Sequence, residues 1–317
     1  MPTRRVVLVV GPGRSGTSAL AGGLQALGMH VPPPVVPADE AGPRGSAESQ
    51  WVVDLHTELL ERANVGLTDA RPSAWFETGK WAANGILRTR VTDWLGPQFA
   101  PLPDEEDEPE LVLKDPRMAW FLGLWKAAAL RVDATPAYLT TLRHVTEVVG
   151  TRDRPSARVA AWVNMMLHTE RGTRGSLRAF VRYDDLLADW TIPLFRVGSD
   201  FGLRAVTEAS ANSMRKVHQF VDPDLHRGRH TWADLAVPPR LQELAEESWG
   251  ALSGLADPDG DTAARHATLD ELREAYVALY EEAEGITAST ADAARREGVG
   301  TAAETDQPKG LKRLLGR

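Results

Sequence analysis

A short apolar run that ends in a glycine-rich turn constrains the fold of this chain most strongly. Residues 6–10 read VVLVV, and residues 11–18 read GPGRSGTS. A continuous run of aliphatic, mostly β-branched residues is typical of a strand buried on both faces of a parallel sheet. Leu20, Leu24 and Leu27 then share one face of a helix. The order strand, glycine loop, helix predicts the opening of a βαβ unit.

Strand and helix patterns alternate along the first 190 residues. Further apolar runs predict strands at residues 111–114, 137–142 and 178–182, with helical patterns between them. After about residue 191 only helical patterns and loops follow. We therefore predict an α/β protein with a P-loop-like, doubly wound, mostly parallel sheet, flanked by helices and followed by a helical C-terminal layer.

The chain is long enough for one α/β domain. We expect this domain over residues 1–288, with the sheet core at about 5–190 and the helical part at about 191–288. Residues 289–317 contain few large apolar groups, which predicts a disordered tail.

Composition excludes several classes of function. There are no cysteines, which rules out a disulfide framework, a thiolate nucleophile and cysteine-ligated zinc. The formal charge of −8 disfavours bulk binding to nucleic acid, which relies on basic surface. The VVLVV run is too short for a signal-peptide core or a membrane span. We expect a cytoplasmic protein without stable membrane insertion, and we predict no metal site.

The glycine loop resembles the Walker A pattern with one substitution. Gly11, Gly16 and Ser18 stand at the right spacing, but Thr17 occupies the position of the lysine. Backbone N–H groups at such a helix start attract an anion, and Arg14 adds a planar guanidinium suited to phosphate or sulfate oxygens. The predicted anion-binding residues are Gly13, Arg14, Ser15, Gly16, Thr17 and Ser18. The absent lysine favours a ligand with a single 5′ phospho-anhydride group, and the alternative is a tight turn that binds nothing.

The stretch VVLVVGPGRSGTSALAGGLQALG resembles the opening of the bacterial sulfotransferases that use 3′-phosphoadenosine-5′-phosphosulfate (PAPS). The resemblance covers roughly residues 5–230. It implies a P-loop-like α/β fold and metal-free, in-line transfer of a sulfuryl group from PAPS to a hydroxyl group. The acceptor would be a small molecule, a carbohydrate or a lipid-linked compound, and 3′,5′-adenosine bisphosphate (PAP) would be the second product.

Further segments downstream carry the resemblance. Arg143, followed eight positions later by Thr151, matches an arginine–serine pair that holds the 3′-phosphate in the family, although Val145 stands where many relatives have proline. The segment KDPR at residues 114–117 matches a family element in which Lys114 would neutralise charge on the transferred group. The segment HRGRH at residues 226–230 falls where relatives carry a basic stretch, so Arg227 is a candidate for contact with the 3′-phosphate or adenine.

The general base is the least determined group. Family members use a histidine or a glutamate, and we rank Glu48 first, His56 second and Asp115 third. The ordinary alternatives are a helix-capping role for Glu48 and a half-buried helix position for His56. The predicted catalytic residues are Arg14, Lys114, Glu48 and His56. The segment YDDLL that starts at Tyr183 also resembles a family element, and we interpret it as mainly structural.

Two other functions remain open at this point. A small-molecule or nucleoside kinase would share the scaffold and the loop, but it needs Mg²⁺ and normally the loop lysine. A non-catalytic protein that binds adenine nucleotides would need the loop alone. The acceptor of a sulfotransferase is not readable from the sequence, and we expect residues 30–47 and 75–94 to recognise it.

Overall fold

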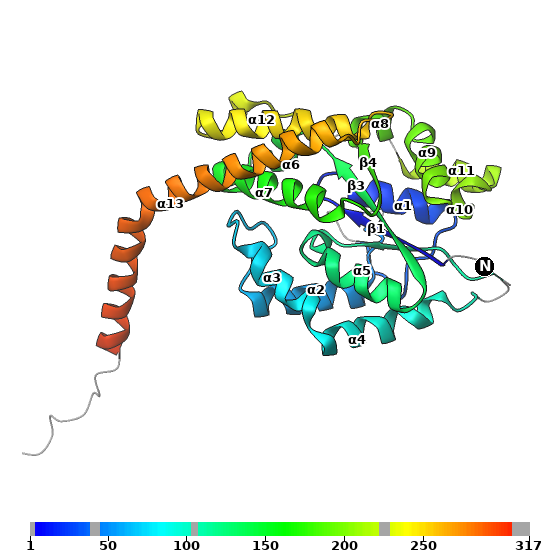
Figure 1. The fold of residues 1–317 in the computed structure, drawn as a ribbon, viewed down its shortest axis with the longest axis horizontal. Coiled ribbons are helices and arrows are strands. Elements are labelled where there is room, and N and C mark those ends of the chain that lie inside the picture. Colours follow the sequence, from blue (N-terminus) through cyan, green and yellow to red (C-terminus); the bar gives the residue numbers. More distant parts are fainter. Residues whose placement is uncertain (1–3, 39–44, 103–106, 222–228, 306–317) are drawn as a thin grey trace, which may run out of the picture. The chain divides into compact units, whose positions relative to one another are not determined.

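The computed structural model describes residues 4–38, 45–102, 107–221 and 229–305 (Figure 1). The chain divides into two compact units, residues 1–276 and 277–317. The first unit is an α/β fold with one four-stranded sheet, and all three strand pairs in it are parallel. The predicted fold class is therefore confirmed.

The strands follow the order β2-β1-β3-β4 across the sheet. Their bounds are Arg4–Val10 for β1, Leu111–Lys114 for β2, Ala134–Leu142 for β3 and Leu177–Arg182 for β4. The apolar run that opened the sequence lies in the middle of the sheet, where Val7 pairs with Val112 on one side and Ala137 on the other. Because all strands are parallel, their carboxyl ends meet at one edge, and this edge places the candidate site.

The sheet is covered on both faces. Alternate side chains of β1 point to opposite sides: Val6 and Leu8 belong to one apolar core, and Val7 and Val9 belong to the other. The first core is completed by α2 (Gln50–Ala63), α3 (Ala74–Ala83), α4 (Gly85–Leu95), η1 (Gly96–Phe99), η2 (Met118–Phe121) and α5 (Leu122–Arg131). The second is completed by α1 (Thr17–Leu27), α8 (Tyr183–Ala188), α9 (Thr191–Phe201), α10 (Arg204–Thr207) and α11 (Ala211–Phe220). Burial on both faces explains why β1 is apolar at every position from Val6 onward.

Residues 79–95, which the sequence predicts to be helical, are divided between two helices. They belong to α3 and α4, and the Asn84 side chain between them accepts a hydrogen bond from the Leu87 amide at 2.9 Å. An asparagine in this position caps the helix that follows it, and its extended backbone ends the helix before it.

After β3 come α6 (Val145–Val149) and α7 (Pro155–Thr173), and α7 leads back to β4. Beyond β4 the described residues form helices, turns and loops and no further strand, as the sequence predicts. Besides α8 to α11, the helices are η4 (Trp232–Asp234), α12 (Pro239–Ser253), η5 (Gly254–Ala256) and α13 (Ala263–Thr305). Among the described helices, none is long and apolar enough to cross a membrane.

The C-terminal segment differs from the prediction. A disordered tail was expected from residue 289, whereas α13 continues as a helix to Thr305. Alanine, glutamate and arginine are strong helix formers, so a segment with few large apolar side chains still keeps helical backbone. Residues 306–317 lie outside the described residues, and the boundary between the two compact units falls after Tyr276, within α13.

Candidate functional site

The glycine loop joins the carboxyl end of β1 to the start of α1 and depends on its glycines sterically. Gly11 has φ +150°, and a Cβ there would lie 2.4 Å from the Thr141 hydroxyl oxygen. Gly16 has φ +99°, and a Cβ there would lie 2.2 Å from a ring carbon of Tyr183. Both positions therefore combine a backbone conformation that favours glycine with a close approach that only glycine allows.

A buried hydrogen bond fixes the loop to the neighbouring strand. The hydroxyl groups of Ser15 and Thr141 lie 2.7 Å apart, and Thr141 belongs to β3. The Ser15 amide donates to the Pro12 carbonyl at 3.1 Å. Ser15 was predicted to bind the anion. Its side chain is instead directed at β3 and fixes the loop there.

The start of α1 is suited to an anion. No side chain in the described part of the chain caps its first turn, and this turn contains no acidic residue. The first N–H groups of an uncapped helix start carry a partial positive charge and lack partners within the helix. The predicted residues Gly13, Gly16, Thr17 and Ser18 all lie in or beside this segment.

Lys114, Ser18 and Glu48 come from three separate segments, and their side chains are in contact. The Lys114 ammonium group donates to the Ser18 hydroxyl at 3.1 Å and also pairs with the carboxylate of Glu48. Only 3% of the Lys114 side chain and 13% of the Glu48 side chain are exposed. The predicted cation and the first-ranked base thus lie together at the start of α1, where β2 ends.

The next residue, Asp115, faces away from the solvent. Its carboxylate accepts from the Arg117 backbone amide at 2.5 Å and lies 3.5 Å from the His56 Nδ1. Burial opposes ionisation of Asp115, but the neighbouring His56 side chain, and next the charge and backbone amide of Arg117, outweigh it and lower the pKa of Asp115. The carboxylate therefore acts locally as a turn-capping group.

His56 lies in the core rather than at the loop. Its side chain has no exposed surface, its Nε2 accepts a hydrogen bond from the Trp125 Nε1 at 2.8 Å, and its ring stacks on Phe121. Because none of its side-chain surface is exposed, this ring is not positioned to contact an acceptor that enters from solvent. We interpret His56 as a structural partner of Asp115, which leaves Glu48 as the base candidate at the loop.

Arg143 lies against the glycine loop from the end of β3. Its Nη1 donates to the Arg14 carbonyl at 3.0 Å, and its Nε donates to the Glu147 carboxylate at 2.9 Å. The remaining nitrogen, Nη2, is buried and has no hydrogen-bond partner in the described part of the chain. A buried donor without an acceptor costs about 1–3 kcal/mol, so this nitrogen is suited to receive an anionic oxygen from a ligand.

The other predicted 3′-phosphate residues are less well placed. Thr151 is exposed two residues beyond α6 and makes no hydrogen bond with Arg143 within the described residues. Arg227 lies outside the described residues, so its predicted contact stays a prediction.

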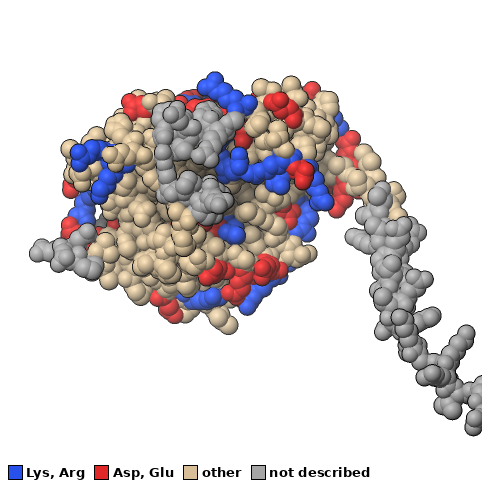
Figure 2. Space-filling model, turned by 180° about the vertical axis from the view of Figure 1, so that it is seen from behind, with Lys and Arg blue, Asp and Glu red and all other residues tan. Residues whose placement is uncertain are grey.

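A basic cluster surrounds the loop. Partial desolvation, and next the charges of Arg14 and Arg158, lower the pKa of Arg152 below its ordinary value. Arg14 and Arg152 are exposed and form no ion pair with any described residue. Figure 2 shows several groups of Lys and Arg side chains on one face of the molecule, one of them near the middle of that face. Like charges held close together favour a bound anion, because it removes their mutual repulsion.

Three residues of the site were not predicted from the sequence: Thr141, Arg152 and Tyr183. Thr141 is the penultimate residue of β3, Tyr183 directly follows β4, and Arg152 lies beyond α6, next to the predicted Thr151. Thr141 and Tyr183 share one signal, because each stands at the carboxyl end of a strand, where parallel sheets bind ligands. Arg152 has no such signal.

Among the described residues, no three His, Asp or Glu side chains lie together in a way that could hold a metal ion. Comparison of the chain with known proteins found no matching family model, no matching curated protein and no matching solved structure.

Proposed function

We propose that this protein is a PAPS-dependent sulfotransferase that transfers a sulfuryl group to the hydroxyl of a small-molecule, carbohydrate or lipid-linked acceptor. The contact of Lys114 with both Glu48 and Ser18 carries this proposal. It brings a cation and a carboxylate base to the start of the helix where the loop would bind the 5′ end of the nucleotide.

The residues at the site suit a ligand with anionic groups at both ends. The start of α1 and Arg14 would bind the 5′-phosphosulfate. The Nη2 of Arg143, which pairs with no described residue, would bind the 3′-phosphate, with Thr151 and Arg227 as further candidates. PAPS supplies the sulfuryl group in this reaction, and the protein supplies positioning and charge.

The catalytic step follows from the same contacts. The acceptor oxygen forms a bond to sulfur while the bond between sulfur and the bridging oxygen of the 5′-phosphate breaks, and Glu48 takes the proton of the acceptor hydroxyl. Lys114 would donate to the oxygens on which charge builds, in exchange for its contact with Glu48. This exchange would release the carboxylate as the base only when the nucleotide is bound.

The position of Lys114 also bears on the kinase alternative. In P-loop nucleotide hydrolases and kinases, the Ser or Thr that ends the loop ligates Mg²⁺. Here the corresponding hydroxyl, that of Ser18, accepts a hydrogen bond from the Lys114 ammonium group. A fixed ammonium at this point supports metal-free transfer, with Lys114 supplying the positive charge.

Ligand-induced thermal shifts test the proposal. PAP in the presence of EDTA should raise the thermal midpoint, since a native-state ligand at a hundredfold excess over its dissociation constant stabilises by about 2.7 kcal/mol. Arg14→Ala and Arg143→Ala should lose the shift, whereas Arg131→Ala, which removes an exposed charge at the end of α5, should keep it. A shift that requires ATP with Mg²⁺ would favour the kinase, and no shift with either ligand would reject nucleotide binding.

A further inference from the structure

Tyr183 connects the two parts of the site that the proposed function assigns to opposite ends of the nucleotide. It is the first residue of α8, directly after the edge strand β4, and only 5% of it is exposed. The sequence segment that contains it was interpreted as mainly structural, and Leu186 and Leu187 in the same segment are indeed buried.

The first contact of the Tyr183 ring is with the glycine loop. A Cβ on Gly16 would lie 2.2, 2.7 and 3.0 Å from three carbons of this ring. The ring therefore lies directly on the last glycine before α1 and occupies the space that any side chain there would need.

The second contact is with Arg143. The guanidinium carbon of Arg143 lies 4.6 Å from the centroid of the Tyr183 ring, which is within the range of a cation–π interaction. Such an interaction is stronger where solvent is excluded, and 9% of Arg143 is exposed. Burial raises the pKa of Tyr183, so the ring stays a neutral phenol and adds no negative charge beside the anion site.

These contacts restrict how the Arg143 guanidinium can bind a ligand. Its Nε donates to Glu147, one N–H of its Nη1 donates to the Arg14 carbonyl, and Tyr183 covers one face. The buried Nη2 has no hydrogen-bond partner among the described residues, so it is the donor best suited to a ligand. The same ring contacts Gly16. One rigid side chain thus fixes where Nη2 lies relative to the start of α1.

We propose that Tyr183 is a positioning residue that sets the spacing between the glycine loop and Arg143, and thereby selects nucleotides with phosphates at both the 5′ and 3′ positions. This inference rests on the proposed function, because it concerns the same nucleotide site. A ligand with a 5′-phosphate alone would use the loop and gain nothing from the fixed position of Nη2.

The test compares the dissociation constants of PAP and adenosine 5′-monophosphate (AMP) in EDTA for the full chain. Wild-type protein should bind PAP at least about tenfold more tightly than AMP. Tyr183→Phe keeps the ring and should keep this ratio. Tyr183→Leu should raise the dissociation constant of PAP about tenfold and that of AMP less than about twofold. The reason is that the cation–π contact and the fixed position of the guanidinium are lost.

Two further variants make the result specific. Phe180→Leu removes another arginine–ring contact, since Arg178 lies 5.2 Å from the Phe180 ring centroid, and it should leave the ratio unchanged. In the Arg143→Ala background, Tyr183→Leu should change the ratio no further, because Tyr183 acts through Arg143. If Tyr183→Leu does not fold, Arg143→Lys provides the measurement, as it keeps the charge but loses the planar stacking group and should lower the ratio similarly.

The outcomes separate this inference from the proposed function. Equal losses of PAP and AMP affinity in Tyr183→Leu, or an unchanged ratio, would overturn the positioning role while PAP binding to the wild type still supports the proposed function. A wild type that does not bind PAP would reject the proposed function itself, and the positioning role with it.

Discussion

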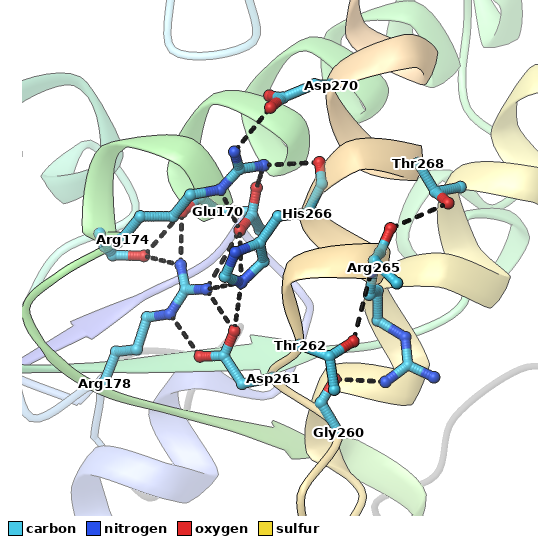
Figure 3. A network of polar contacts seen from close by, with 12 residues as sticks. Glu170, Arg174, Arg178, Gly260, Asp261, Thr262, Arg265, His266, Thr268 and Asp270 are labelled. Carbon is cyan, nitrogen blue, oxygen red and sulfur yellow. Dashed lines mark hydrogen bonds and ion pairs between the residues drawn. The ribbon is translucent and has the colours of Figure 1, made fainter.

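The carboxylate of Glu170 lies 3.1 Å from the guanidinium of Arg178, and both groups are withdrawn from solvent, with 0% and 5% of their side chains exposed. Arg174 pairs with the same carboxylate at 2.6 Å. Figure 3 shows this network reaching from α7 and β4 to Asp261 and His266 at the beginning of α13. The network therefore connects the start of α13 to α7 and β4 through charged groups, in addition to the buried side chains of Leu269, Leu272 and Tyr276.

Glu170→Gln should lower the free energy of unfolding by about 3 kcal/mol, because it leaves two arginines paired with a neutral group in a buried position. Urea denaturation of the full chain measures this change. Glu77→Gln is the matched control, since Glu77 pairs with Lys80 on the surface and is 41% exposed. Loss of this surface ion pair should lower the free energy of unfolding by less than about 1 kcal/mol. Equal effects of the two substitutions would contradict the importance of the buried network.

Replacement of His168 should reduce the pH dependence of stability in acid. Burial, and next the charges of Arg273 and Arg171, lower the pKa of His168 to about 3, so it stays neutral in the folded chain while the unfolded chain protonates near pH 6.5. The unfolded state then binds more protons, and stability falls as the pH drops from about 6.5 towards 3.

His168→Phe removes this proton and keeps an aromatic ring beside Trp75, whose centroid lies 4.5 Å from that of His168. The difference in thermal midpoint between pH 7 and pH 4 should be smaller in this variant than in the wild type. An unchanged difference would mean that other groups account for the acid sensitivity.

Gly16→Ala should destabilise the protein by about 3 kcal/mol, because a Cβ is strained at φ +99° and would overlap the Tyr183 ring. Gly13 lies in the same loop, and nothing lies within 4 Å of a Cβ built there. Gly13→Ala should therefore change stability by less than about 1 kcal/mol. Thermal or urea unfolding of the two variants measures the difference. An unchanged stability of Gly16→Ala would show that the Tyr183 ring moves away readily.

Glu48→Gln should lower sulfuryl transfer by about 10² to 10⁴-fold if Glu48 is the base, since the amide cannot accept the proton of the acceptor. The measurement is transfer of label from PAPS to a panel of hydroxylated acceptors, with PAP binding followed separately. PAP affinity should stay within a few-fold of the wild type, because the substitution leaves the loop and Arg143 intact. His56→Gln is the comparison, and a larger loss of transfer in that variant at equal stability would reverse the ranking of the two residues.

The sequence by itself predicted the parallel sheet and the loop at which the candidate site lies. The continuous apolar residues of β1 require burial on two faces, and Gly11 and Gly16 require a turn with unusual backbone angles, so the strand–loop–helix unit was readable locally. Arg143 was readable because it follows a strand, and the carboxyl ends of parallel strands share one edge.

The tertiary structure decided which groups meet at that edge. The contact of Lys114 with Glu48 joins residues 66 positions apart, and the stacking of Tyr183 on Arg143 joins the segments that follow β4 and β3, so neither leaves a periodic signal in the sequence. The sequence ranked Glu48 above His56 only by resemblance. Glu48 stands just before α2 and His56 in the middle of it, and only packing determines that His56 is buried against Trp125. Local patterns are set by neighbours along the chain, whereas the site is set by neighbours in space.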